Sequence, residues 1–170
     1  MGNIITNPLF ISGALKAPDS YYFCSKNINM KNNFDIPQLF LRLVLGIGFL
    51  LPVMDRFGWL GAAGVNGNAW GNWESFVSYT NSLMPYLSKS LAGIMAALAT
   101  LAEIVFGITL IIGFKIRLAA IGSFLLTLIF ALSMAVFLGP RIPFNYSVFA
   151  DSAAALLLAC IPAYRWSISD

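Results

Sequence analysis

Residues 91–113 form the run Leu91-Ala-Gly-Ile-Met-Ala-Ala-Leu-Ala-Thr-Leu-Ala-Glu103-Ile-Val-Phe-Gly-Ile-Thr-Leu-Ile-Ile-Gly113, which is apolar except for a few small polar residues and one charge. A helix of this length can cross a bilayer, since a span needs about 20 apolar residues. The charged residue, Glu103, is costly at such a depth unless it is paired, hydrated or neutral. The run therefore predicts a transmembrane helix that carries a structural or binding site.

Three further apolar runs accompany this one, at about residues 36–54, 118–138 and 148–163. Of the 170 residues, 59% are hydrophobic and only 10% are charged, whereas soluble domains carry about a quarter charged residues. We therefore predict an all-α integral membrane protein whose residues 34–170 form a bundle of four transmembrane helices. Residues 1–33 are polar, and we expect them to be either a disordered tail or a segment upstream of the true start.

A polar, glycine-rich and aromatic loop, about residues 57–90, separates the first two apolar runs. Part of it shows helical periodicity, which predicts a short amphipathic helix on the outer membrane face, where Trp and Tyr are favoured. Two roles are open for this helix: a lid packed on the bundle, or a cover over a lipid-facing site. Its apolar face is expected to consist of Trp73, Phe76, Val77, Thr80, Leu83 and Met84.

The composition argues against several classes of function. The chain has no histidine, and its two cysteines, Cys24 and Cys160, lie far apart. We therefore expect no metal site, no iron–sulfur cluster and no reactive dithiol within the chain. A redox role would need a bound organic cofactor or a partner subunit. The net charge is +3, and no basic patch interleaved with aromatic residues suggests nucleic-acid binding.

Arg42 is a second ionisable residue in an apolar run. Either it snorkels to the cytoplasmic headgroups, or it points inward to a carboxylate, for which Glu103 is the candidate. Gly46 lies one turn on and would let a neighbouring helix or a flat ligand come close. Thr100 and Gly107 flank Glu103 on one helix face, which predicts a small, polar stripe facing protein. Glu103 then either holds the bundle together or binds a polar headgroup.

Two further carboxylates complete the candidate set. Asp55 ends the first helix at the outer surface beside Arg56, and adjacent residues need not pair because they point in different directions. Asp151 falls in the first turn of the last helix, where the helix dipole favours a negative charge. We assign no catalytic residue and no metal ligand. The candidate ligand-binding residues are Arg42, Gly46, Asp55, Thr100, Glu103, Gly107 and Asp151.

The distribution of Lys and Arg predicts that both termini lie in the cytoplasm. Six of these residues fall in the tail, the turn at 113–117 and the C-terminus, namely Lys16, Lys26, Lys31, Lys115, Arg117 and Arg165. The other side holds three, namely Arg56, Lys89 and Arg141.

Several short motifs follow one another along the chain in a fixed order and spacing. They are Leu41-Arg42-Leu43 with Gly46 and Phe49-Leu50, Asp55-Arg56-Phe57-Gly58, Glu103 with Gly107, Leu110 and Gly113, Arg117-Leu-Ala-Ala120, and the C-terminal Tyr-Arg165-Trp-Ser. Together they resemble the DoxX family of membrane proteins over about residues 34–167. The resemblance implies a four-helix membrane fold and a link to thiosulfate:quinone oxidoreductase, terminal oxidase complexes or oxidative-stress defence.

Residues and resemblance together leave two main hypotheses. The first is a quinone-associated subunit of a redox system, with a quinone or lipid headgroup bound near Arg42 and Glu103; any enzyme activity would belong to a quinone-linked oxidoreductase complex. The second is a structural or assembly subunit in which these residues hold the bundle together. A small-solute transporter is a weaker third alternative. We expect a multi-pass protein of the bacterial cytoplasmic membrane, with the bilayer and other subunits, or copies of itself, as partners.

Overall fold

The computed structural model describes residues 34–169, which form helices and connecting loops without a β-strand in that range. The prediction of an all-α fold is therefore confirmed. The predicted tail at 1–33, with its two interpretations, lies outside the described residues. The helices are α2 (Asp35–Arg56), α3 (Trp73–Leu83), α4 (Lys89–Ile112), α5 (Ile116–Phe137), α6 (Ile142–Asn145) and α7 (Val148–Ala159).

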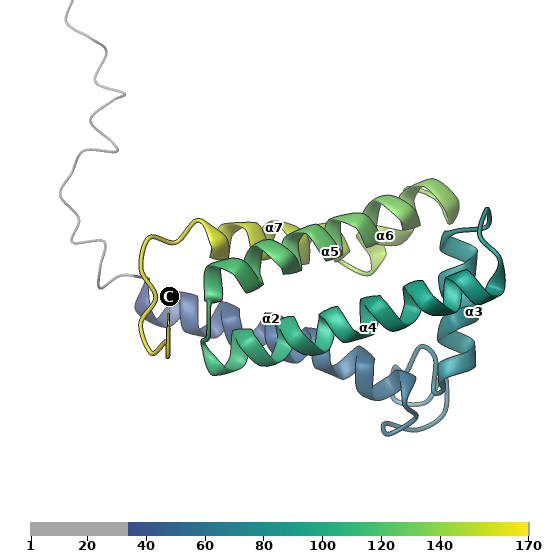
Figure 1. Cartoon of the computed structure of the whole chain (residues 1–170), viewed down its shortest axis with the longest axis horizontal. Helices are drawn as coiled ribbons and strands as arrows, with labels where there is room; N and C mark the ends of the chain where they lie inside the picture. The colour runs from purple at the N-terminus through teal and green to yellow at the C-terminus, as the bar shows by residue number, and fades with distance from the viewer. Residues whose placement is uncertain (1–33, 170) are drawn as a thin grey trace, which may run out of the picture. The chain divides into compact units, whose positions relative to one another are not determined.

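The helices pack in two pairs. Helix α2 lies along α4, and α5 lies along α7, while α4 also contacts α5 (Figure 1). Helices α2 and α4 are antiparallel, because Arg42 near the start of α2 contacts Leu110 near the end of α4. The short turn between α4 and α5 contains Gly113 in a left-handed conformation, with φ +81°, which ends α4.

The long helices bury their small and polar residues and expose large apolar ones. On α4, Glu103 is 4% exposed whereas Leu101 is 58% exposed. A helix that is apolar on its outer face as well is suited to lipid rather than water. Helices α2, α4 and α5 are each long and apolar enough to cross a membrane. The buried residues of α4 are Ala92, Ala96, Thr100, Glu103, Gly107 and Leu110.

The predicted fourth span, residues 148–163, is shorter than expected. Helix α7 has 12 residues, and so measures about 18 Å, whereas the hydrocarbon core of a bilayer is about 30 Å thick. It begins after Ser147, whose φ of +57° interrupts the helical path, and it ends three residues before Pro162, a residue type that disfavours helix in the residue before it. Four membrane-spanning helices are therefore not confirmed: three helices of the described chain reach spanning length.

The predicted amphipathic helix is confirmed as α3, which ends one residue earlier than expected. Its buried residues, Phe76, Val77, Thr80 and Leu83, all belong to the predicted apolar face. Helix α3 packs against α4, as expected for a lid on the bundle. The side chain of Tyr79 is partly buried there, and burial, with a smaller contribution from Tyr146, raises the pKa of its phenol.

Gly46 and Gly107 allow α2 and α4 to pack closely. A Cβ atom at Gly46 would lie 2.6 Å from Cγ1 of Ile111 and 2.9 Å from the carbonyl oxygen of Gly107. A Cβ atom at Gly107 would lie 3.0 Å from the carbonyl oxygen of Gly46. Of the two uses proposed for Gly46, the approach of a neighbouring helix is the one observed.

We predict that Gly46→Val destabilises the bundle, because the added methyl groups would overlap α4. Overpacking of this kind costs about 1–3 kcal/mol. Gly48→Val is the matched control, since a Cβ atom there meets nothing within 4 Å. Thermal unfolding in detergent should show a lower midpoint for Gly46→Val than for Gly48→Val, and equal midpoints would contradict the close approach.

Candidate functional site

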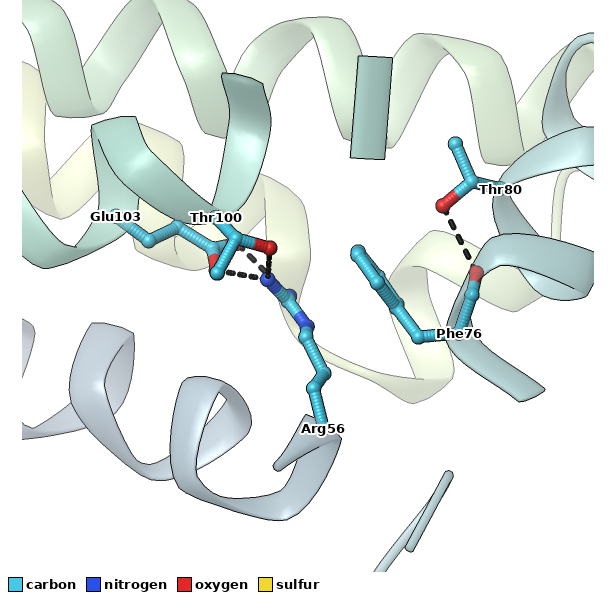
Figure 2. A network of polar contacts seen from close by, with 5 residues as sticks. All are labelled: Arg56, Phe76, Thr80, Thr100 and Glu103. Atoms are coloured by element: carbon cyan, nitrogen blue, oxygen red, sulfur yellow. Dashed lines mark hydrogen bonds and ion pairs between the residues drawn. The ribbon is translucent and has the colours of Figure 1, made fainter. Parts of the chain in front are cut away.

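A buried ion pair joins the last residue of α2 to the middle of α4. The guanidinium of Arg56 donates two hydrogen bonds to the carboxylate of Glu103, from Nη1 to Oε2 and from Nη2 to Oε1, the second 3.0 Å long (Figure 2). The two residues are only 3% and 4% exposed. Such a two-pronged contact is the strongest form of a charge-assisted pair and fixes the orientation of both groups.

Arg56 also contacts a hydroxyl group and two aromatic rings. Its Nη1 donates to Oγ1 of Thr100, 2.9 Å away and one turn from Glu103. Its guanidinium carbon lies 3.7 Å from the ring centroid of Phe76 and 5.1 Å from that of Trp70, which places it within range of cation–π attraction. The Nε atom is buried and has no acceptor among the described residues. The guanidinium is thus held by α4 on one side and by aromatic residues on another.

Asp55 organises the loop that supplies one of these rings. Its carboxylate accepts hydrogen bonds from the backbone N–H groups of Ala69, at 2.8 Å, Trp70, at 3.1 Å, and Gly71, at 2.9 Å. Gly71 has φ +65°, and a Cβ atom there would collide with the backbone of Ala63. The carboxylate of Asp55 therefore binds the loop backbone, and these hydrogen bonds position Trp70, whose ring lies over the guanidinium of Arg56.

A largely open apolar pocket of about 430 Å³ lies beside the ion pair. Its two aromatic side chains, Phe57 and Trp73, are nearly parallel, with ring centroids 6.2 Å apart. Thr100 supplies the polar side chain among the residues that line it. The lining residues are Phe57, Trp73, Ala97, Thr100, Leu101 and Ile104.

Arg42 does not pair with Glu103, so that expectation is wrong. Its Nε donates to the carbonyl oxygen of Leu110 at 3.1 Å, and its Nη1 donates to the carbonyl oxygens of Arg165 and Trp166. At 1% exposure it does not snorkel either. Because α2 and α4 are antiparallel, Arg42 meets the end of α4, and it lies 14 residues, or about 21 Å, from Arg56 along the helix.

The other six candidates separate into four groups. Thr100 and Glu103 lie together at the ion pair, whereas Gly46 and Gly107 form the helix contact between the two arginines. Asp151 lies in the first turn of α7, as predicted, and is exposed; none of the contacts described for Arg56 involves it. Asp55 and Arg56 end α2, as predicted, and both side chains are buried.

Arg56 is the residue of this site that the candidate set missed. The sequence contained a signal for it, because Arg56 follows one apolar run and Glu103 is the one charged residue inside the next, so packing of these two helices can join them. Within the part of the chain that the structure describes, no group of three His, Cys, Asp or Glu residues is placed to hold a metal ion.

The family model for DoxX matches residues 37–137, which is more than half of the chain. The chain belongs to the DoxX family. The resemblance inferred from its motifs is thereby confirmed, and with three apolar helices of spanning length it is a DoxX membrane protein. No curated protein and no solved structure matches it.

In this DoxX protein the family match contains the whole ion pair together with Asp55 and Thr100. The charges of Arg56 and Glu103 cancel locally, so the arrangement does not offer a net positive site. It offers hydrogen-bond donors beside an apolar pocket. Such a combination suits a neutral ligand with acceptor oxygens, since pockets for small molecules are mostly apolar with a few placed polar groups.

We predict that Asp55→Asn loosens the loop at residues 69–71. The amide keeps one acceptor oxygen and loses the charge, and hydrogen bonds to charged groups contribute about 1.5–3 kcal/mol each. Hydrogen exchange of these three amides should become faster by at least about tenfold. Asp151→Asn is the control, because that carboxylate is exposed. Unchanged exchange in Asp55→Asn would contradict the role given to this residue.

Proposed function

We propose that this DoxX protein is a membrane subunit of a quinone-linked redox or oxidative-stress system and binds a quinone in the pocket beside Thr100. One observation carries the proposal: an open apolar pocket with two nearly parallel aromatic rings is lined by Thr100, whose hydroxyl group contacts Arg56. A quinone ring is flat and apolar, and its carbonyl oxygens accept hydrogen bonds.

The position of the pocket supports a ligand that arrives from the membrane. Leu101, one of the lining residues, belongs to the exposed apolar face of α4. The pocket volume of about 430 Å³ falls in the range of small-molecule sites, about 300–1,000 Å³. Arg42, which we first expected to contact the quinone, donates to backbone carbonyls instead, so the proposed site lies at the other end of α2.

The proposed role requires help from other components. The chain has no histidine and no closely spaced cysteine pair, so the bound quinone and a partner subunit would carry the electrons. We place the protein in the bacterial cytoplasmic membrane with both termini in the cytoplasm, on the bias of Lys and Arg residues.

A structural or assembly subunit is the second candidate. It is favoured by the contacts of Arg56, which joins the end of α2 to Thr100 and Glu103 of α4. In that case the ion pair would hold the bundle, and the pocket would be filled by lipid chains. The two functions differ in whether the pocket binds a quinone saturably.

The proposal predicts saturable quenching of tryptophan fluorescence by a short-chain quinone in lipid nanodiscs, because Trp73 lines the pocket. Ala97→Phe should abolish the saturable part by filling the pocket. Leu98→Phe is the matched control, since Leu98 is exposed on the same helix and is not one of the lining residues. Quenching that rises only linearly in the unmodified protein, as by collision in the bilayer, would refute quinone binding and favour the structural role.

A further inference from the structure

We infer that Thr100 selects the ligand of this pocket, because its hydroxyl group donates a hydrogen bond to an acceptor oxygen of a neutral ring compound. Arg56 contributes by polarising this hydroxyl group. The inference rests on the proposed function and specifies it, since it names the donor and the chemistry that the donor accepts. Thr100 is 3% exposed overall, lines the pocket and accepts a hydrogen bond from Arg56.

The hydroxyl group of Thr100, unlike those of the other threonines in the described helices, does not donate to a carbonyl oxygen of its own helix. Thr80, Thr109 and Thr127 each donate to a carbonyl oxygen one turn back, at 2.9, 2.7 and 2.8 Å. That is the usual use of a threonine hydroxyl inside a helix. Thr100 makes no such bond: its oxygen accepts from Arg56, and its hydrogen has no acceptor among the described residues. Because Thr100 also lines the pocket, this donor belongs to a residue of the pocket wall.

The contact with Arg56 strengthens this donor. A hydroxyl group that accepts from a cation is polarised, and its own O–H becomes a better donor. The buried Nε of Arg56 is a second donor without an acceptor in the described chain. Buried donors without acceptors are costly. A ligand that brings acceptor oxygens would relieve this cost, whereas a hydrocarbon chain would not.

The charges around Thr100 select against an anionic headgroup. Arg56 is neutralised by Glu103, and the neighbouring Asp55 adds a negative charge that is also buried. A phosphate group would lose its hydration in this pocket without meeting a net positive charge. The occupant that fits is a neutral ring with carbonyl oxygens rather than a phospholipid headgroup.

Two probes with the same ring system test the inference. They are 2-methyl-1,4-naphthoquinone, which carries two carbonyl acceptors, and 2-methylnaphthalene, which carries none and is measured by displacement of the first. We expect the unmodified protein, in phosphatidylcholine nanodiscs, to bind the naphthoquinone about tenfold more tightly, the effect of one strong hydrogen bond between neutral groups. Thr100→Val should remove this preference, because it should weaken the binding of the naphthoquinone and leave that of 2-methylnaphthalene unchanged. Thr100→Ser should retain the preference.

Thr109→Val is the matched control, because Thr109 lies on the same helix and its hydroxyl donates within that helix. If the unmodified protein binds neither probe saturably, the proposed function fails. If it binds both equally, or if Thr100→Val keeps the preference, quinone binding stands and the role of Thr100 is overturned. Weaker naphthoquinone binding in nanodiscs that contain phosphatidylglycerol would overturn the selection for a neutral ligand. The comparison of the two probes on the unmodified protein needs no substitution and so does not depend on the folding of a variant.

Discussion

The position of Arg56 at the end of a membrane helix imposes the main constraint on this structure. A guanidinium that is 3% exposed must find its acceptors within the protein, because an unpaired buried charge costs several kcal/mol. Glu103 and Thr100 supply these acceptors from α4, and the ring of Phe76 covers the cation from α3. One side chain thus joins three helices. The pocket proposed for a quinone lies beside this junction.

Each end of α2 carries a buried arginine that needs hydrogen-bond acceptors within the protein, and the two ends supply different acceptors. At the end near α3 an arginine meets a carboxylate, whereas at the other end Arg42 meets the backbone carbonyls of α4 and of the C-terminal segment. Between them, Gly46 and Gly107 bring the two helices close. The hydrogen bonds described for Arg42 all end on carbonyl oxygens of the chain, while Gln38 beside it keeps a buried Oε1 without a hydrogen-bond partner among the described residues. Only the end near α3 has donors without acceptors in the described residues.

The apolar runs were sufficient to predict the three long helices, and helical periodicity predicted α3 and its buried face. Glu103 could be recognised as buried because no carboxylate is placed in an apolar helix without a partner. Its partner could not be chosen from the sequence, since Arg42 and Arg56 lie on the same helix and only the pairing of α2 with α4 decides between them. The contacts of Asp55 were also hidden, because they depend on how a loop of glycines returns to the helix end. The end of α7 was placed too late because hydropathy continues past Ala159, where the helix stops.

The small residues of α5 show that a regular spacing in the sequence can predict which face of a membrane helix packs against a neighbour. Five residues of the sequence at four-residue spacing, Ala119, Ser123, Thr127, Ala131 and Ala135, predict close helix packing. The first four are buried, whereas Ala135 is only half-buried. Helix α7 packs against this helix, and the hydroxyl of Ser152 donates to the carbonyl oxygen of Phe124. Such regular spacing indicates a neighbouring helix, whereas the partner of a single ionisable residue, as for Glu103 and Arg56, lies far away in the sequence.

A double-mutant cycle on Arg56→Met and Glu103→Leu, measured by unfolding in detergent, tests the central claim most directly. Each single change leaves a buried charge unpaired and should cost about 3–5 kcal/mol, whereas the double variant should cost much less than the sum. The exposed pair of Lys89 and Glu74, whose side chains are 64% and 83% exposed, is the control and should show a coupling below about 1 kcal/mol. Additive effects at Arg56 and Glu103 would contradict the account, because they would mean that the pair does not hold α2 to α4.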